Sequence, residues 1–321
     1  MSFSKQVKEE LLKTKMEDDE SSLAFLCGII KAIGKIEFLH DDIEVTLDTD
    51  VAGLYDYCNL ILKNLYGDYA ELEITEKAVI NKTLYYNIKF PTSSAKQILL
   101  DTGILTLTNK GYEVTEELDS HIFKSQENIV AYLKACFLAC STNSIRISEV
   151  ASVKSSSGYH LEFTSHNKLF LSKLNEILAT QGILAKLVER KNLFVLYLKD
   201  ATSISDLLAL IGADESVLIL QNEIATREVR NSVNRQINCF SANITKTVGA
   251  NAKQLEAIEM ISSTIGLESL PQELEEVALL RLANTEESLS DLVKLSGLTL
   301  TKSGINHRMR KILKIAEELK D

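Results

Sequence analysis

The chain has 321 residues, of which 45 are acidic and 35 are basic, giving a formal net charge of −10. Its hydrophobic content of 45% and charged content of 25% are ordinary for a soluble globular protein, and its length predicts two or three domains. The negative balance excludes a surface that is basic overall, so a contact with nucleic acid requires a local basic patch. Two prolines in the whole chain argue against long linkers and low-complexity tails.

No membrane segment or signal peptide is expected. The longest apolar run, residues 23–30, is far shorter than the about 20 residues that span a bilayer. The five cysteines are scattered and odd in number, which indicates reduced thiols in a cytoplasmic protein. Cys136 and Cys140 are four residues apart, but no further ligands accompany them, so we expect buried core thiols and neither a metal nor a cofactor.

Two apolar segments rich in small residues dominate the first two thirds of the chain. A short charged helix is predicted within residues 1–21, and the first apolar segment, 23–34, follows it. The second segment occupies 132–142. When Leu26 is aligned with Leu133, Gly28 falls on Ala135, which predicts two matching helices that pack closely face to face.

The same order of elements follows each apolar segment, as alternating strands and glycine-terminated helices. The first copy predicts a strand at 43–47, a helix at 51–66, strands at 70–75 and 84–90, and a helix at 93–102; the second predicts 160–164, 168–180, 185–189, 193–198 and 203–211. We therefore predict an α+β domain over 22–215, with the order αββαββα occurring twice, in pseudo-repeats at about 22–110 and 128–215. The period is near 107 residues.

Residues 26–34, LCGIIKAIG, resemble the LAGLIDADG motif of homing endonucleases, whose duplicated fold has this element order. The resemblance implies a catalytic divalent metal on an acidic residue just before the last glycine. That position holds Ile33 in the first copy and Cys140 in the second, and the earlier acidic position holds Lys31 and Leu138. Without these carboxylates a hard cation has no ligands, so we expect no catalytic residue, no metal and no enzyme activity.

Residues 216–265 are predicted to be a helical connector rich in Asn and Arg. Asn231, Asn234 and Asn238 fall on one helical face with Arg227 and Arg235, although Asn is a mediocre helix former. One interpretation is a solvated pair of helices that links the domains. The other is a secondary DNA contact, for which the candidates are Arg230, Asn231, Asn234, Arg235 and Lys246.

The last part of the chain, 266–321, predicts three helices at 271–283, 288–297 and from 301 onward. Pro271 stands near the start of the first helix, and a glycine-containing turn separates the second helix from the third. Short helices before a basic last helix are typical of a helix-turn-helix domain, which we place between about Ser288 and Leu319.

The last helix is basic on one side and apolar on the other. Residues 301–316 contain no acid, and Ile305, Met309 and Ile312 fall on one stripe with Ala316 and Leu319. The DNA-binding candidates are Lys302, Ser303, Asn306, His307, Arg308, Arg310, Lys311 and Lys314. Among these, Asn306, His307 and Arg310 are expected at base edges and Lys302, Lys311 and Lys314 at phosphates, whereas Arg308 lies at the border of the stripe. A merely solvated basic face is the alternative, and the helices upstream favour DNA binding.

Three features together resemble the WhiA-type sporulation and cell-division regulators of Gram-positive bacteria, over essentially the whole chain. They are the degenerate LAGLIDADG pair, the segment RNSVNR at 230–235, and KSGINHRMRKI at 302–312. One departure is that residues 135–136 and 140–141 read AC and CS where relatives tend to have glycines.

The resemblance implies a DNA-binding regulator of cell division and chromosome segregation, associated with the nucleoid, with duplex DNA as its partner. RNA polymerase or another protein is a second candidate partner for the N-terminal domain. The alternative function is a protein- or ligand-binding module for which DNA contact is secondary, because the outer strands carry Glu44, Asp48, Glu71 and Glu73.

Overall fold

The computed structural model describes residues 2–39, 42–77, 83–109, 111–115, 117, 123–145, 147, 158–296 and 301–320. The chain divides into two compact units, Met1–Thr226 and Arg227–Asp321. In the described part of the chain, no helix is both long enough and apolar enough to cross a membrane.

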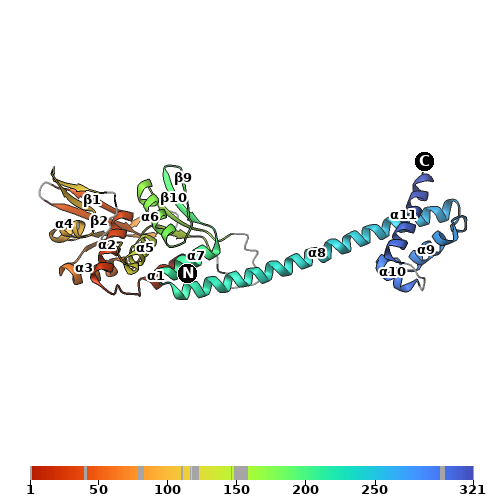
Figure 1. Cartoon of the computed structure of the whole chain (residues 1–321), viewed down its shortest axis with the longest axis horizontal. Helices are drawn as coiled ribbons and strands as arrows, with labels where there is room; N and C mark the ends of the chain where they lie inside the picture. The colour runs from red at the N-terminus through yellow and green to blue at the C-terminus, as the bar shows by residue number, and fades with distance from the viewer. Residues whose placement is uncertain are drawn as a thin grey trace. The chain divides into compact units, whose positions relative to one another are not determined.

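The N-terminal unit contains the duplicated fold (Figure 1). After α1 (Phe3–Leu11), the first copy comprises α2 (Asp19–Ile33), β1 (Gly34–Phe38), β2 (Ile43–Thr49), α3 (Leu54–Tyr66), β3 (Glu71–Lys77), β4 (Thr83–Lys89) and α4 (Thr92–Asp101). The second comprises α5 (Gln126–Cys140), β7 (Ser141–Asn143), β8 (Leu161–Ser165), α6 (Lys168–Thr180), β9 (Lys186–Arg190), β10 (Leu193–Leu198) and α7 (Ala201–Leu210). The predicted αββαββα order and fold class are confirmed in both copies.

Each copy builds one four-stranded antiparallel sheet, with the orders β1-β2-β4-β3 and β7-β8-β10-β9. Helices α2 and α5 begin at Asp19 and Gln126, and this offset of 107 residues matches the predicted period. A hairpin of β5 (Leu105–Thr108) and β6 (Gly111–Val114) follows the first copy and was not predicted. Its strands are only four residues long, so their alternation is too brief to distinguish from a loop.

The two copies meet where α2 packs against α5, as the small residues predicted. A Cβ atom added at Gly28 would lie 2.8 Å from the Cβ of Ala135 and 2.8 Å from the carbonyl oxygen of Tyr132. Both distances are below van der Waals contact, so only a hydrogen atom fits at this position. The closely packed helix pair forms the centre of a single core that both sheets cover.

A buried lysine links this helix pair to the segment between α1 and α2. Lys134 of α5 is 3% exposed, and its ammonium donates hydrogen bonds to the Thr14 carbonyl and hydroxyl oxygens at 2.9 and 2.6 Å. It also donates to the Tyr57 hydroxyl at 2.9 Å. Burial lowers the pKa of Lys134 to about 8. A buried cation is costly unless its hydrogen-bond donors have acceptors. The three hydrogen bonds of the Lys134 ammonium therefore offset the free-energy cost of burying it.

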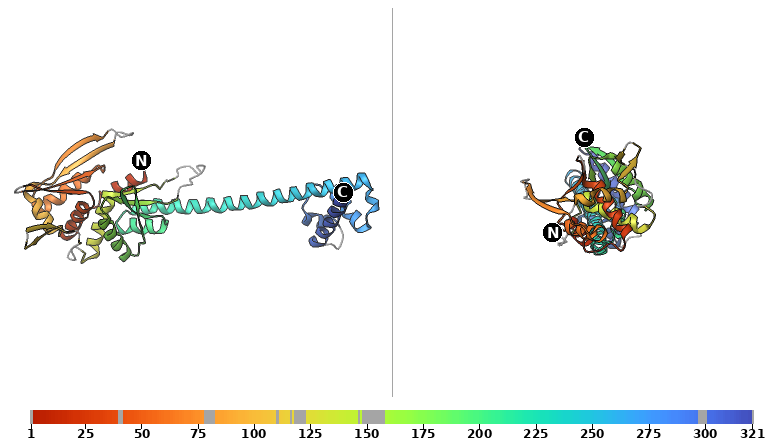
Figure 2. Two further views of the ribbon diagram at one scale, coloured as in Figure 1. Left: turned by 90° about the horizontal axis from the view of Figure 1, so that it is seen from above. Right: turned by 90° about the vertical axis from the view of Figure 1, so that its left-hand side faces the viewer.

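The C-terminal unit forms around the end of a long helix, α8 (Asp214–Thr264), which begins in the N-terminal unit. The short 3-10 helix η1 (Leu267–Ser269) follows, and then α9 (Gln272–Ala283), α10 (Leu289–Leu295) and α11 (Lys302–Glu318). Figure 1 shows α9, α10 and α11 gathered at the C-terminal end of α8, and the left view of Figure 2 agrees. The expected pair of connecting helices is wrong, because α8 runs without a break through the Asn-rich stretch and through Gly249.

Replacement of Gly28 by Val is expected to destabilise the N-terminal unit by about 1–3 kcal/mol, because α2 and α5 must separate to admit the side chain. Chemical denaturation followed by circular dichroism measures this change. The control is Gly158→Ala, since a Cβ at Gly158 meets nothing within 4 Å. Equal stabilities of the two variants would contradict the close helix contact.

Candidate nucleic-acid interface

Helix α11 begins at a defined cap and binds the rest of the unit through one face. Thr301 is in extended conformation, and its hydroxyl accepts a hydrogen bond from the Gly304 N–H at 3.2 Å, which satisfies one of the free donors of the first turn. Further along α11, the apolar stripe enters the core of the unit. Its buried members are Ile305, Met309, Ile312 and Ala316. Burial of this stripe determines which face of α11 remains free.

Helix α10 is held in place by its own cap. The Ser288 hydroxyl accepts a hydrogen bond from the Asp291 N–H at 3.3 Å and donates one to the Asp291 carboxylate at 2.7 Å. Lys294 donates to the same carboxylate at 2.7 Å, and these contacts from Lys294 and Ser288 lower the pKa of Asp291. Leu292 is buried against the same core as α11. Together α10 and α11 are the two helices that the sequence predicted for a helix-turn-helix.

The exposed side chains of α11 before Ala316 are all polar, whereas Leu313 is partly buried against the core of the unit. The exposed candidates are Lys302, Ser303, His307, Arg310, Lys311 and Lys314, and Asn306 is half-buried. At 100° per residue these seven positions fall within one half of the helix circumference. The structure thus brings together four cations, one amide, one hydroxyl and one imidazole on a single surface.

Two charged contacts refine this set. Arg308 is only 19% exposed, and its guanidinium pairs with the Glu273 carboxylate of α9 at 3.1 Å, so it lies at the edge of the helix packing rather than on the free face. Lys314 pairs with Glu318 at 3.6 Å, and both side chains are well exposed. An exposed pair of this kind is weak. The Lys314 ammonium therefore stays available for a phosphate.

The secondary candidates lie on α8, a different helix from α11. Asn231, Asn234, Arg235 and Lys246 are exposed, whereas Arg230 is half-buried. At 100° per residue the five positions fall within less than half of the helix circumference, with Arg230 at one edge of this arc and Lys246 at the other. The structure thus places them on one side of α8.

The turn between α9 and α10 is fixed by two buried polar residues that the sequence reasoning missed. Asn251 of α8 directs its side-chain amide nitrogen to the carbonyl oxygens of Thr285, Glu286 and Glu287, at 3.1–3.3 Å. Arg281, which is fully buried, donates through Nη1 to the carbonyl oxygens of Asn284 and Glu287, at 3.1 and 2.7 Å. No sequence pattern marks either residue. Their partners are backbone carbonyl oxygens, which any residue type provides, so the bonds leave no trace in the sequence.

The ends of α2 and α5 carry no carboxylate at the positions where the nuclease motif has its acid. Ile33 is the last residue of α2, and Cys140, the last residue of α5, is buried. Burial raises the pKa of the Cys140 thiol to about 12, which keeps it protonated at neutral pH. The described ranges hold no group of three or more His, Cys, Asp or Glu side chains that could bind a metal ion. Cys136 is buried as expected, whereas Cys239 on α8 is exposed.

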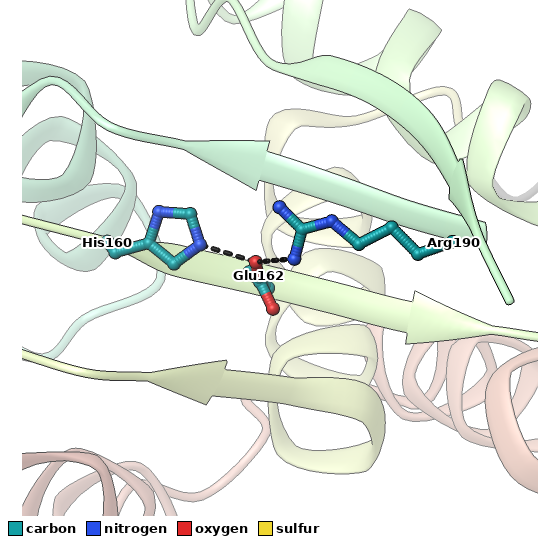
Figure 3. A network of polar contacts seen from close by, with 3 residues as sticks. All are labelled: His160, Glu162 and Arg190. Atoms are coloured by element: carbon teal, nitrogen blue, oxygen red, sulfur yellow. Dashed lines mark hydrogen bonds and ion pairs between the residues drawn. The ribbon is translucent and has the colours of Figure 1, made fainter. Parts of the chain in front are cut away.

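One further polar network lies on the second sheet (Figure 3). The Glu162 carboxylate of β8 lies between the His160 imidazole and the Arg190 guanidinium, whose Nη1 is 2.9 Å from it. Although partial burial opposes ionisation, the contacts with His160 and Arg190 lower the pKa of Glu162. His160 also stacks on Tyr197 of β10. The carboxylate is satisfied within the sheet, so this network ties strands together.

These features define a class of protein, a duplicated LAGLIDADG-like fold followed by a helix-turn-helix domain. Family models agree: the WhiA N-terminal LAGLIDADG-like domain matches residues 19–105, the WhiA LAGLIDADG-like domain matches 148–230, and the WhiA C-terminal HTH domain matches 233–316.

Similar proteins extend this agreement to the whole chain. A protein named "Probable cell division protein WhiA" from Thermoanaerobacter sp. (strain X514) is 36% identical over 323 residues, covering 100% of this chain and 99% of that protein. Its namesake from Clostridium perfringens (strain SM101 / Type A) is 35% identical over 321 residues, with the same coverage. A solved structure described as "full-length DUF199/WhiA from Thermatoga maritima" superposes with a TM-score of 0.57 at 26% identity, covering 99% of both chains. The chain belongs to the WhiA family.

Replacement of Asn251 by Ala is expected to lower the free energy of unfolding of the C-terminal unit by about 1–3 kcal/mol, because three backbone carbonyls of the turn lose the donor that the buried Asn251 supplies. Thermal unfolding of the full chain, followed by hydrogen exchange of α9–α11, measures the loss. The matched control is Asn243→Ala on the exposed part of the same helix. An equal effect of the two changes would show that Asn251 does not hold the turn.

Proposed function

We propose that this protein binds duplex DNA by placing the free face of α11 in the major groove. The observation that carries the proposal is the separation of the two faces of α11: the apolar stripe is buried, and the opposite face carries four cations together with Ser303, Asn306 and His307. A helix of this kind supplies both phosphate contacts and hydrogen bonds to base edges.

The side chains divide into two roles. Asn306, His307 and Arg310 contact base edges, because an amide or a guanidinium can pair with a base through two hydrogen bonds. The lysines at 302, 311 and 314 contact phosphates and add affinity without sequence preference. Ser303 contacts the sugar-phosphate backbone of the DNA. Arg308 supports the interface by holding α11 against α9 through its ion pair with Glu273. Because each contact of a lysine with a phosphate releases counterions from the DNA, binding weakens as the salt concentration rises.

The basic and amide side chains of α8 form a second contact in this proposal. Arg230, Asn231, Asn234, Arg235 and Lys246 offer donors to phosphates from a helix outside the helix-turn-helix. Four of the five are exposed, which supports their availability. Substitution of these five residues by alanine is expected to weaken binding to all DNA sequences by the same factor.

In the cell, we place this activity in the control of cell division and chromosome segregation, as a sporulation-type transcription factor associated with the nucleoid. The names of the relatives support the division role. The N-terminal unit does not cleave DNA in this proposal, since Ile33 and Cys140 occupy the positions where the nuclease motif has its acid. Mg²⁺-dependent cleavage of plasmid or linear DNA by the purified chain would overturn this part.

A second function is favoured by the first sheet, whose strand register puts four acids on one face. Asp48 and Glu73 both lie opposite Asn87, and Glu71 lies opposite Lys89, which pairs with Glu44 at 2.7 Å. Lys35 also pairs with Asp48 at 2.7 Å, so the four acids exceed the two lysines on this face and its net negative charge disfavours a duplex. It instead suits a basic protein surface, and RNA polymerase or another protein is the partner we propose for it. Binding of DNA by residues 1–215 as tightly as by the full chain would contradict this role.

The DNA proposal is tested by comparing Arg310→Ala with Lys314→Ala. Selection of bound sequences from a random duplex pool first supplies a preferred site. Arg310→Ala is expected to reduce the preference for that site over random DNA by about 1–3 kcal/mol. Lys314→Ala is expected to weaken binding to the preferred and the random duplex equally. It should also reduce the magnitude of the slope of log affinity against log salt concentration by about 1.

Fluorescence anisotropy across a salt series measures both effects. The control is Lys5→Ala, an exposed lysine of α1 in the N-terminal unit, which is expected to bind as the unchanged protein does. If Arg310→Ala and Lys314→Ala had the same effect on the preferred and the random duplex, the assignment of roles on α11 would be wrong.

A further inference from the structure

The middle of α8 exposes a continuous apolar stripe that the described helices α9, α10 and α11 of its own unit leave uncovered. Its six members are 46–70% exposed: Val229, Val233, Ile237, Phe240, Ile244 and Val248. They fall within about 100° of the helix circumference. The stripe ends three residues before Asn251, where α8 enters the core of the C-terminal unit. In both views, this part of α8 is clear of α9, α10 and α11 (Figures 1 and 2).

A helix with this sequence needs a packing partner. Every residue from Asn231 to Lys246 is exposed, so the described part of the C-terminal unit does not bury these turns. The stretch is also rich in Asn and in the β-branched residues Val, Ile and Thr, which are poor helix formers. Helical stability in proteins comes mainly from packing of an apolar face. Burial of the stripe would therefore stabilise a helix whose residues have low intrinsic helix propensity.

The spacing of the stripe indicates what that partner is. Successive members are 4, 4, 3, 4 and 4 residues apart, and this series is the same when it is read backwards. A two-fold axis midway between Ile237 and Phe240 therefore puts each apolar side chain opposite another. Val229 then meets Val248 of the second copy, Val233 meets Ile244, and Ile237 meets Phe240. A self-complementary patch of this kind is what a two-fold symmetric dimer requires.

The residues beside the stripe also suit a second copy. Asn234, Ser241 and Thr245 border it on one side, and Gln236 and Asn243 border it on the other. These side chains are neutral and can both donate and accept hydrogen bonds, so the central turns of two copies meet without like charges. Arg235 and Lys246 lie on the far side of the helix and stay exposed.

We propose that two copies of this chain associate through an antiparallel pairing of their α8 helices along this stripe. The stripe is about 28 Å long, from 19 residue steps of about 1.5 Å each. A helix pair of that length buries on the order of 1,000 Å² in total, which is at the lower end for a specific interface. The dimer is therefore concentration-dependent, and it leaves the far face of α8 and the free face of α11 accessible.

Sedimentation equilibrium of the full chain tests the dimer, without DNA and independently of any DNA-binding role. The expected result is a species of twice the 35.8 kDa chain mass as concentration rises. The double change Ile237→Asp and Phe240→Asp is expected to raise the dimer dissociation constant by about 100-fold or more, because it puts four charges in the centre of the interface. The control Ala242→Asp adds a carboxylate on the far face and leaves the dimer intact. Circular dichroism checks that each variant keeps its helix.

Cysteine cross-linking tests the antiparallel register. In a Cys239→Ser background, the double change Val229→Cys and Val248→Cys is expected to form disulfide-linked dimers. Val229→Cys alone is expected to form none, because its two copies lie about 28 Å apart in this register. Cross-linking by the single variant would indicate parallel helices and overturn the proposed register.

Two outcomes would overturn the dimer itself. One is a monomer at every concentration up to about 0.1 mM, which is above the dissociation constant of any specific interface of this kind. The other is stripe-dependent binding to vesicles of phosphatidylglycerol and phosphatidylcholine by a chain that remains monomeric, which would assign the stripe to a membrane surface.

Discussion

The N-terminal unit depends on one helix contact in which only a hydrogen atom fits. Gly28 of α2 lies against Ala135 and the Tyr132 backbone of α5, so the two helices approach more closely than larger side chains would permit. Strands β1 and β7 begin directly at the ends of these helices, at Gly34 and Ser141. The helix contact therefore sets the position of both sheets. It needs small side chains and no acid, so the packing persists where the nuclease motif's acid is replaced by Ile33 and Cys140.

The C-terminal unit follows the same physical rule, with a different consequence. Burial of Ile305, Met309, Ile312 and Ala316 fixes the rotation of α11 about its axis, and this rotation determines that lysine, arginine and asparagine face outward. The buried contacts of Asn251 and Arg281 hold the preceding turn, and thus the angle between the helices. Hydrophobic packing and two buried side chains that bond to the turn therefore orient a surface whose own side chains make few contacts within the protein.

Helix α8 differs from α11 because its apolar stripe is not covered within the chain. Val229 to Val248 present one apolar side, and the opposite side carries Arg235 and Lys246. If two copies pair through the apolar side, each dimer carries two helix-turn-helix domains and two basic faces. Binding through two linked modules raises the overall affinity for DNA with two suitably spaced sites, without any new contact to the bases. This effect would offset the modest charge of a single domain on an acidic chain.

The sequence by itself determined the duplication, its period, the order of elements and the two faces of α11, because helical and strand periodicities are local properties of the chain. Local patterns also mark the positions where the nuclease acids are missing. Only the tertiary structure decided that α8 is one unbroken helix, that Arg308 pairs with Glu273, and that Lys134, Asn251 and Arg281 are buried with partners. These depend on atoms brought together from distant or separately folded segments. Burial of a polar side chain is set by what folds over it, and a one-dimensional pattern does not contain that information.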